Sequence, residues 1–176
     1  MIIKGSNGAF ATDLPNKKLK TIIWDIRDHE IKSVTLTSSG YYCVVWGRNG
    51  YSVAGPDELK EKIREAHDNC ETIFSVSISE NGNWAMVTDK QFDASHSADL
   101  KAFRLAKERY GQITSVCISN HGFCAVCERG VFYTNIPNVL EEELKSIKFK
   151  PANIFFLDDG TYFIADKDGD MRSTYL

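Results

Sequence analysis

The chain has 176 residues, of which 43% are hydrophobic and 26% are charged. This length is enough for one domain whose hydrophobic core needs no disulfide or metal to hold it together. The 21 basic and 24 acidic residues give a net charge of −3. This balance excludes a general electrostatic attraction to nucleic acid or to anionic membranes, so we expect a partner that is recognised by local shape, and another protein above all.

The cysteines and the first residues indicate a cytoplasmic protein. Five cysteines, an odd number, lack the dense spacing of a secreted disulfide scaffold: Cys43, Cys70, Cys117, Cys124 and Cys127. The opening MIIKGSNGAFATDLP has three apolar residues before Lys4, too few for the hydrophobic region of a signal peptide or for a membrane span. We therefore expect reduced thiols and a cytoplasmic location.

A ten-residue pattern recurs along the chain as SVTLTSSGYY (33–42), SVSISENGNW (75–84), SVCISNHGFC (115–124) and NIFFLDDGTY (153–162). Its glycines, Gly40, Gly82, Gly122 and Gly160, are separated by 42, 40 and 38 residues. A near-constant period of this size is typical of stacked supersecondary units. We predict a single repeat domain over 1–176, with units at about 1–30, 31–71, 72–111, 112–151 and 152–176.

Each unit is predicted to contain three strands. Before the glycine, apolar and polar residues alternate, as at Val34 and Leu36, which is typical of a half-buried strand. The runs after the glycine, such as YYCVVW and NWAMVT, are apolar on both alternations, so this second strand is the inner, doubly covered one. Turn residues follow, among them Asn-Gly at 49–50 and Asp-Gly at 168–169, and we expect Gly50 to supply the positive φ of a tight turn before a short third strand.

The period then shifts to that of a helix. Pro56 suits the first helical position, and Leu59, Ile63 and Ala66 form one apolar stripe. The same design recurs at 15–26, 97–108 and 137–147. The fold class predicted is an α+β repeat protein, with about five antiparallel β-hairpin or three-stranded units alternating with four amphipathic helices. The units form a propeller-like ring, or alternatively an open α/β solenoid.

The motif SV-x-I-x-x-x-GYYCVVWGRNGY, followed by GPDELKEKI, resembles bacterial tandem repeats of about 40 residues, which combine a Gly-aromatic hairpin, an Asn-Gly turn and a Pro-led helix. The resemblance is clearest over 31–78 and implies a propeller-like fold with no established activity. The period also resembles that of WD-repeat propellers, although Trp24-Asp25 falls inside a predicted helix. The unit of strand, strand, helix and strand is similar to the pentein propeller, but no pentein catalytic motif matches.

Three features of the sequence could carry a metal or catalytic site, and for each we predict a structural role instead. Cys124 and Cys127 form a CxxC, but residues i and i+3 of a strand face opposite sides, so we expect core packing rather than metal or redox work. The stretch DKDGD (166–170) lacks the glycine position and the final glutamate of a calcium loop, and we expect a turn. The four histidines are predicted to lie at helix ends or in loops: His29, His67, His96 and His121. No catalytic residue, metal ligand or cofactor site is predicted.

The aromatic side chains of the hairpins are the most informative candidates. Repetition would align several of them on one face, where such rings anchor partner proteins or stack on sugars; the alternative is that they fill the space between units. The predicted binding residues are Tyr41, Trp46, Tyr51, Trp84, Phe132 and Tyr133. The sequence thus favours a non-enzymatic module for protein–protein interaction. Alternatives are a small-ligand or carbohydrate-binding domain and an enzyme with a dispersed site.

Overall fold

The structure is a computed structural model that describes residues 2–5, 8–11 and 17–174, with side chains from residue 17 onward. Within these residues, the order strand, strand, helix, strand occurs four times and is followed by a last pair of strands. The predicted order of elements and the predicted four helices are therefore confirmed.

The described helices and strands form successive units. The first has β1 (Ile2–Gly5), β2 (Gly8–Ala11) and α1 (Lys17–Asp25). The second has β3 (Ile31–Leu36), β4 (Tyr42–Trp46), β5 (Gly50–Ala54) and α2 (Asp57–Asp68). The third has β6 (Ile73–Ile78), β7 (Trp84–Thr88), β8 (Phe92–Ala94) and α3 (Ser97–Tyr110). The fourth has β9 (Ile113–Ile118), β10 (Phe123–Cys127), β11 (Gly130–Thr134) and α4 (Asn138–Ser146). The fifth has β12 (Asn153–Phe156), β13 (Tyr162–Ala165) and β14 (Met171–Ser173).

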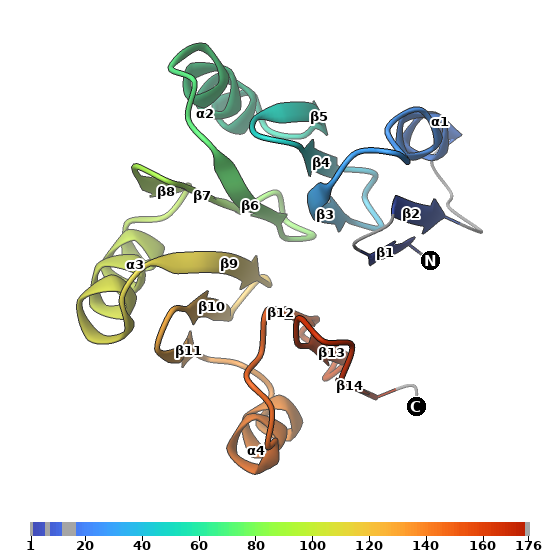
Figure 1. The fold of residues 1–176 in the computed structure, drawn as a ribbon. Coiled ribbons are helices and arrows are strands. Elements are labelled where there is room, and N and C mark those ends of the chain that lie inside the picture. Colours follow the sequence, from blue (N-terminus) through green and yellow to red (C-terminus); the bar gives the residue numbers. More distant parts are fainter. Residues whose placement is uncertain (1, 6–7, 12–16, 175–176) are drawn as a thin grey trace.

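Each of the last four units is a three-stranded antiparallel sheet, whereas β1 and β2 form a two-stranded sheet. The second strand lies in the middle of each three-stranded sheet, as predicted. The sheets follow one another around an arc, with the helices at its periphery (Figure 1). The strands nearest the middle of the arc are the first strands of the units, β3, β6, β9 and β12, a position that the sequence pattern did not predict.

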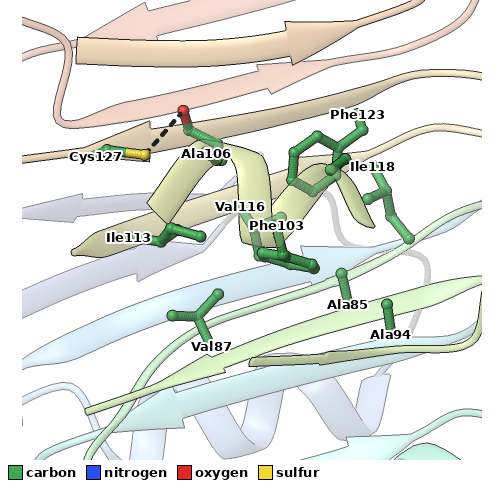
Figure 2. Close-up of a cluster of buried hydrophobic side chains, with 12 residues drawn as sticks. Ala85, Val87, Ala94, Phe103, Ala106, Ile113, Val116, Ile118, Phe123 and Cys127 are labelled. Atoms are coloured by element: carbon green, nitrogen blue, oxygen red, sulfur yellow. Dashed lines mark hydrogen bonds between the residues drawn. The ribbon is translucent and has the colours of Figure 1, made fainter. Parts of the chain in front are cut away.

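The hydrophobic core is divided into four clusters, and each lies between two successive units. Alternate residues of a middle strand therefore belong to different clusters. In β7, Trp84 and Met86 pack with α2, whereas Ala85 and Val87 pack with α3. Figure 2 shows the cluster that contains Ala85 and Val87, in which α3 lies over two sheets. The units thus bury their apolar faces on their neighbours, which explains why middle strands are apolar on both alternations.

The predicted helical stripe is confirmed in α2, where Leu59, Ile63 and Ala66 are all fully buried. Asp57 and Glu58 occupy the first turn, next to the positive end of the helix dipole, as the sequence predicts. Pro56 lies one position before the helix rather than at its first residue. Its fixed φ is compatible with either place.

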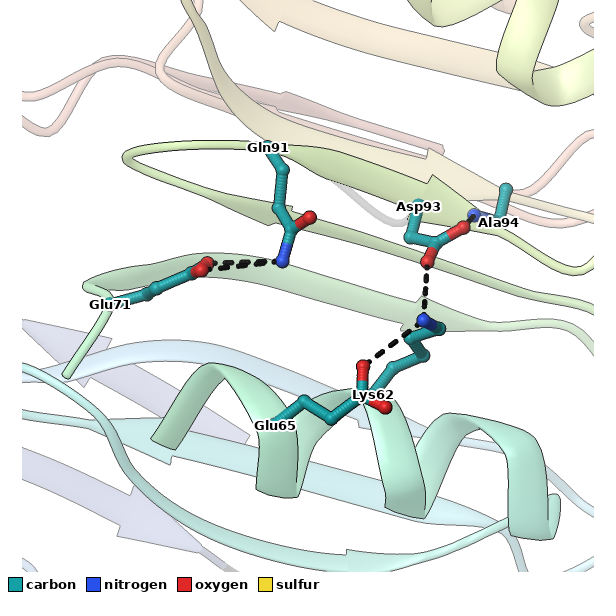
Figure 3. A network of polar contacts seen from close by, with 6 residues as sticks. All are labelled: Lys62, Glu65, Glu71, Gln91, Asp93 and Ala94. Carbon is teal, nitrogen blue, oxygen red and sulfur yellow. Dashed lines mark hydrogen bonds and ion pairs between the residues drawn. The ribbon is translucent and has the colours of Figure 1, made fainter. Parts of the chain in front are cut away.

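Polar contacts also connect successive units at the periphery. The Lys62 ammonium of α2 lies 3.0 Å from Glu65 and 3.6 Å from Asp93 of β8 (Figure 3). The carboxylate of the buried Glu71 accepts hydrogen bonds from Thr88 Oγ1 at 2.7 Å and from Gln91 Nε2 at 3.3 Å. These contacts fix α2, and the segment that follows it, against the third sheet.

The serines of the first strands bridge successive units. Ser33 Oγ accepts from Val76 N and donates to Val76 O, both at 3.1 Å, and Ser75 Oγ makes the same two contacts with Val116. Ser77 Oγ likewise accepts from Ile118 N at 3.0 Å. The predicted half-buried pattern holds in β3, whereas β6 and β9 are buried on both faces along most of their length, with Ser75 only 4% exposed. The hydroxyls satisfy backbone groups at the free edge of the next strand, which would otherwise be unpaired.

The hairpins between first and middle strands form a second chain of contacts. Glu80 accepts from the backbone N–H of Ser38 at 2.8 Å, and Asn120 Oδ1 accepts from Asn81 N at 3.0 Å. Asp158 accepts in turn from Asn120 N at 3.1 Å. Each hairpin tip thus donates to a polar side chain at the tip of the following unit.

The repeat glycines are not all equivalent. Three of them have positive φ, of +92°, +80° and +93°: Gly40, Gly82 and Gly160. Gly122 does not, because the fourth hairpin has one residue fewer between its paired strands; its carbonyl accepts from Ser119 N, as Tyr41 O accepts from Thr37 N. A Cβ at Gly122 would lie 2.5 Å from Asn135 O, so close approach rather than φ requires glycine there.

The prediction that Gly50 supplies the positive φ of its turn is wrong. The positive φ of this turn belongs to Gly47, at +56°, and Gly50 begins β5 without one. A Cβ on Gly50 would lie 2.5 Å from Trp46 Nε1, so the indole ring occupies the space that a side chain would need. At 168–169, by contrast, Gly169 has the expected positive φ of +105°.

Candidate interaction surface

The aromatic residues predicted to bind a partner do not form one face. They are distributed over all four inter-unit clusters: Trp46 with α1, Tyr41, Tyr51 and Trp84 with α2, Phe132 with α3, and Tyr133 with α4. Trp84 is 1% exposed, which excludes its ring from any docking surface of the folded chain. The other five are partly buried, an arrangement that fits the alternative of filling space between units.

A contiguous apolar surface lies instead on the fifth sheet. Phe155 of β12, Phe163 of β13 and Met171 of β14 are 41%, 39% and 44% exposed. Phe155 pairs directly with Phe163, and Met171 pairs with Ala165, two residues further along β13. Because side chains alternate along a strand, these residues share one face. We call this face, with Asn153, Phe155, Phe163, Ala165 and Met171, the terminal face.

In the preceding sheets, the equivalent positions are covered. Strand register aligns Phe163 with Ala85, Ala165 with Val87, and Met171 with Phe92. Ala85 and Val87 are 0% and 3% exposed, and together with Phe92 they pack against α3 and the fourth sheet (Figure 2). The terminal face therefore presents to solvent what the other sheets direct at the next unit.

The aligned repeats contain a signal for this surface. Phe155 stands at the position of Thr35, Ser77 and Cys117, and Phe163 at that of Cys43, Ala85 and Cys124. Small or polar residues at two repeat positions are thus replaced by phenylalanine in the last unit. Such a departure from the repeat pattern distinguishes an exposed face from a covered one.

The opposite face of the fifth sheet is attached to α4. Tyr162 OH donates to a Glu143 oxygen at 3.4 Å, and Arg172 Nε lies 3.5 Å from the other oxygen of Glu143. Burial and the neighbouring Glu143 carboxylate raise the pKa of Tyr162, so the hydroxyl keeps its proton. These contacts hold β13 and β14 in place, with the terminal face directed away from α4.

The turn predicted at 166–170 is confirmed. Asp166 Oδ1 accepts hydrogen bonds from the backbone N–H groups of Asp168, Gly169 and Asp170 at 2.8, 2.8 and 2.9 Å. One carboxylate oxygen therefore organises the backbone of the turn. Asp168 is exposed in this turn beside the terminal face, whereas Asp170 lines a hollow with Glu143 and Arg172 on the α4 side.

The cysteines are placed as the alternation predicts. Cys124 packs in the cluster around α4 and Cys127 in the cluster around α3, and all five thiols are free. Burial raises the pKa of Cys117 to about 11, so its thiol stays neutral and is a poor nucleophile or ligand at neutral pH. Among the described residues, no group of three or more His, Cys, Asp or Glu side chains is suited to hold a metal ion.

A hollow of about 430 Å³ lies between the start of α3 and the fourth hairpin. Its polar lining includes Asn83, whose Oδ1 is 3.0 Å from His96 Nε2, and its apolar lining includes the predicted residue Phe132. Burial raises the pKa of Asp99 in this lining, although the nearby His96 opposes the shift. The hollow therefore combines an aromatic ring with amide, imidazole and carboxyl groups.

Comparison with known proteins assigns no family. No protein-family model matches the chain, and no curated protein matches it. A solved structure described as YCF48 bound to D1 peptide shows 14% sequence identity and a TM-score of 0.29, covering 95% of this chain and 57% of that one. The chain thus spans little more than half of that structure's length, and a likeness of this strength carries no argument. None of the helices in the described ranges is long and apolar enough to cross a membrane.

Proposed function

We propose that this chain is a non-enzymatic repeat module that binds another protein through the terminal face. One observation carries the proposal: Phe155, Phe163 and Met171 are exposed side by side at positions that the other units cover. Phenylalanine and methionine are enriched at protein interfaces, and a few large apolar side chains can anchor a partner in a small contact. We therefore propose the same function that the sequence predicts, protein binding, and assign it to the fifth sheet instead of the aromatic hairpins.

The exposure of the terminal face also favours the open form of the predicted repeat architecture. A closed propeller-like ring would bring the first unit against the fifth sheet and cover Phe163 and Met171. Their exposures of 39% and 44% support an arc that is open at this sheet and available to a partner. The free thiols support the cytoplasmic location expected from the cysteine pattern.

Binding is favoured over catalysis by the chemistry of the titratable groups. Burial raises the pKa of Cys117 and Cys127 to about 11, opposite to the activation that a nucleophilic thiol requires. The hollow beside α3 supports a second candidate, a small polar or carbohydrate ligand, because its volume of about 430 Å³ and its mixed lining suit such a molecule. Saturation-transfer NMR with a panel of monosaccharides and nucleosides tests this candidate, and Asn135→Ala in the lining would weaken a true binder.

Site-specific photo-crosslinking tests the proposed function. The photoreactive amino acid p-benzoylphenylalanine is placed at position 163 of the full chain in its native host, and at position 139 as a control. Val139 is exposed on α4, at 51%, and lies outside the terminal face. We expect protein adducts at position 163 that are absent at 139 and that disappear when Phe155→Ser is added. Identical adducts at both positions, or none at 163, would contradict the proposal.

A further inference from the structure

In the second to fourth units, the face of the sheet directed at the following unit is covered by different elements in its outer and inner parts. The outer strands lie against helices, as β8 lies against α3, whereas the first strands lie against the first strand of the next unit, as β6 lies against β9 (Figure 1). A covered sheet therefore meets a helix on its outer part and strands on its inner part. The terminal face carries residues at both kinds of position.

The inner part of the terminal face is already filled by its own side chains. Phe155 replaces the Ser77 type of residue, whose hydroxyl contacts the next first strand, and Phe163 replaces Ala85 on the middle strand. Two phenyl rings occupy the volume that strands of a following unit would need, and overpacking of this size is destabilising. A further unit of the same kind does not fit on this surface.

The outer part of the terminal face remains open. Ala165 stands at the position of Val45 and Val87, and the flexible Met171 replaces the rings of Tyr51 and Phe92. These positions lie on β13 and β14, where a helix lies on the preceding sheets. A smaller residue and an adaptable one leave room for a helix beside the Phe155–Phe163 pair.

Acidic residues flank the terminal face at both ends of its strands. Asp159 lies at the hairpin tip and Asp168 at the opposite turn, and both are exposed, whereas Asp158 accepts hydrogen bonds from the preceding unit and Asp170 lines a hollow on the α4 side. Hydrogen bonds from Thr161 lower the pKa of Asp159, so this exposed carboxylate is charged at neutral pH. Among the nearby cations, Arg172 and Lys148 line the same hollow beside α4, where Arg172 faces Glu143, and Lys167 lies in the turn between β13 and β14. The flanks favour a cationic ligand and disfavour an anionic membrane.

On the basis of the proposed function, we infer that the terminal face binds a single basic amphipathic α-helix of another protein, laid across β13 and β14. Its apolar stripe contacts Phe163 and Met171, and its Lys and Arg side chains face the aspartates at the two ends. A helix in an apolar groove with charged flanks is a common mode of peptide recognition.

A second copy of this chain is a poorer occupant. Three strands of three or four residues form a face of roughly 200 Å², from strand spacings of about 5 Å and rises of about 3.3 Å, far below the roughly 800 Å² per partner of a stable dimer. The chain's helices α1 to α4 also bury their own stripes, so they are not free to dock. The same small area predicts that the partner helix binds weakly and reversibly.

The chain supplies matched probes for the test. Residues 97–110, SADLKAFRLAKERY, have a net charge of +2 and an amphipathic pattern, whereas residues 137–147, PNVLEEELKSI, are amphipathic with a net charge of −2. Both are made as hydrocarbon-stapled peptides, with helicity verified by circular dichroism, and are titrated into the full chain. Binding is followed by methionine-methyl and aromatic NMR signals. We expect the basic peptide to shift Met171 and Phe163 signals and to bind at least tenfold more tightly than the acidic one.

Variants of the full chain separate the two contributions. Phe163→Ser is expected to weaken binding of the basic peptide at least tenfold, and Asp168→Asn two- to threefold with a reduced salt dependence, whereas Val139→Ser leaves binding unchanged. Melting temperatures confirm that each variant is folded. Equal binding of both peptides, tighter binding of a strand peptide of residues 113–121, or a dimer that Phe163→Ser dissociates would each overturn the helix assignment.

The proposed protein-binding function and the inferred helix ligand can be disproved independently of each other. If position 163 crosslinks to a partner whose attached segment is not a basic helix, the inference is wrong and the interaction module stands. If position 163 crosslinks to nothing while the basic peptide still binds the isolated chain, the helix preference of the surface stands and the physiological role is lost.

Discussion

The third and fifth sheets have the same topology and opposite surroundings. Ala85 on β7 is fully buried under α3 and the fourth unit, whereas Phe163, at the equivalent position of β13, is 39% exposed. The covered position carries a small residue because a neighbour fills the space; the open position carries a large ring because nothing in the described chain does. Side-chain size at this repeat position therefore differs between a covered face and an open one.

The largest expected effect concerns the helix that covers the third sheet. Phe103 is fully buried between Phe92 and Phe123, at ring distances of 5.0 and 4.9 Å. Phe103→Ala is expected to lower the free energy of unfolding by about 3–5 kcal/mol, and Phe163→Ala by less than about 1 kcal/mol. Urea denaturation measures both. Equal losses would mean that the terminal face is covered in solution.

Alkaline pH provides the next largest effect, at the fourth sheet. The ordinary thiol pKa of 9.0 is raised to about 11 by burial of Cys117 in the folded chain, so the protonated form stabilises the fold. That contribution is complete below pH 9 and is lost between pH 9 and 11, at about 1.4 kcal/mol per pH unit. Cys117→Ala is expected to reduce this loss, and urea denaturation of the wild type and the variant across this pH range measures the difference.

A smaller effect is expected at the shortened fourth hairpin. Gly122→Ala places a Cβ near Asn135 O and is expected to cost about 2 kcal/mol. Gly40→Ala, in a longer hairpin with open space around the glycine, introduces only the positive-φ strain of about 1 kcal/mol. Thermal unfolding compares the two variants, and a larger loss for Gly40→Ala would reverse our assignment of the two glycines.

The smallest effect distinguishes the polar positions of the two sheets. Ser75→Ala leaves Val116 N and O without their side-chain partner and is expected to cost about 1–2 kcal/mol. Asn153, at the same position of the last unit, is partly exposed on the terminal face, and Asn153→Ala is expected to change the free energy of unfolding by less than about 0.5 kcal/mol. Chemical denaturation of both variants at one pH provides the comparison.

The element order was predictable because its causes are local. Alternating hydrophobicity, turn residues and apolar stripes such as Leu59, Ile63 and Ala66 act within a few positions of the chain. The binding residues were not predictable in the same way. Whether Trp84 is buried or exposed depends on the preceding unit, whose β4 and α2 pack against that face of its strand.

The terminal face shows the same limit. The aligned repeats place Phe155 and Phe163 at positions that carry small or polar residues in the second and third units. That the two rings are paired on one exposed face follows only from the strand register and from their exposure in the structure. This information comes from contacts between strands, which a single sequence pattern does not contain.

The bridges between first strands weaken toward the end of the chain. Two serines, Ser33 and Ser75, each contact both backbone groups of their partner residue, whereas the last junction has the Cys117 thiol 3.9 Å from Phe156 O. A thiol is a poorer donor than a hydroxyl, so this bridge to β12 is weaker than the two bridges before it. Native-state hydrogen–deuterium exchange is therefore expected to be faster in β12 than in β6 and β9, which would make the last sheet more adaptable than the two before it.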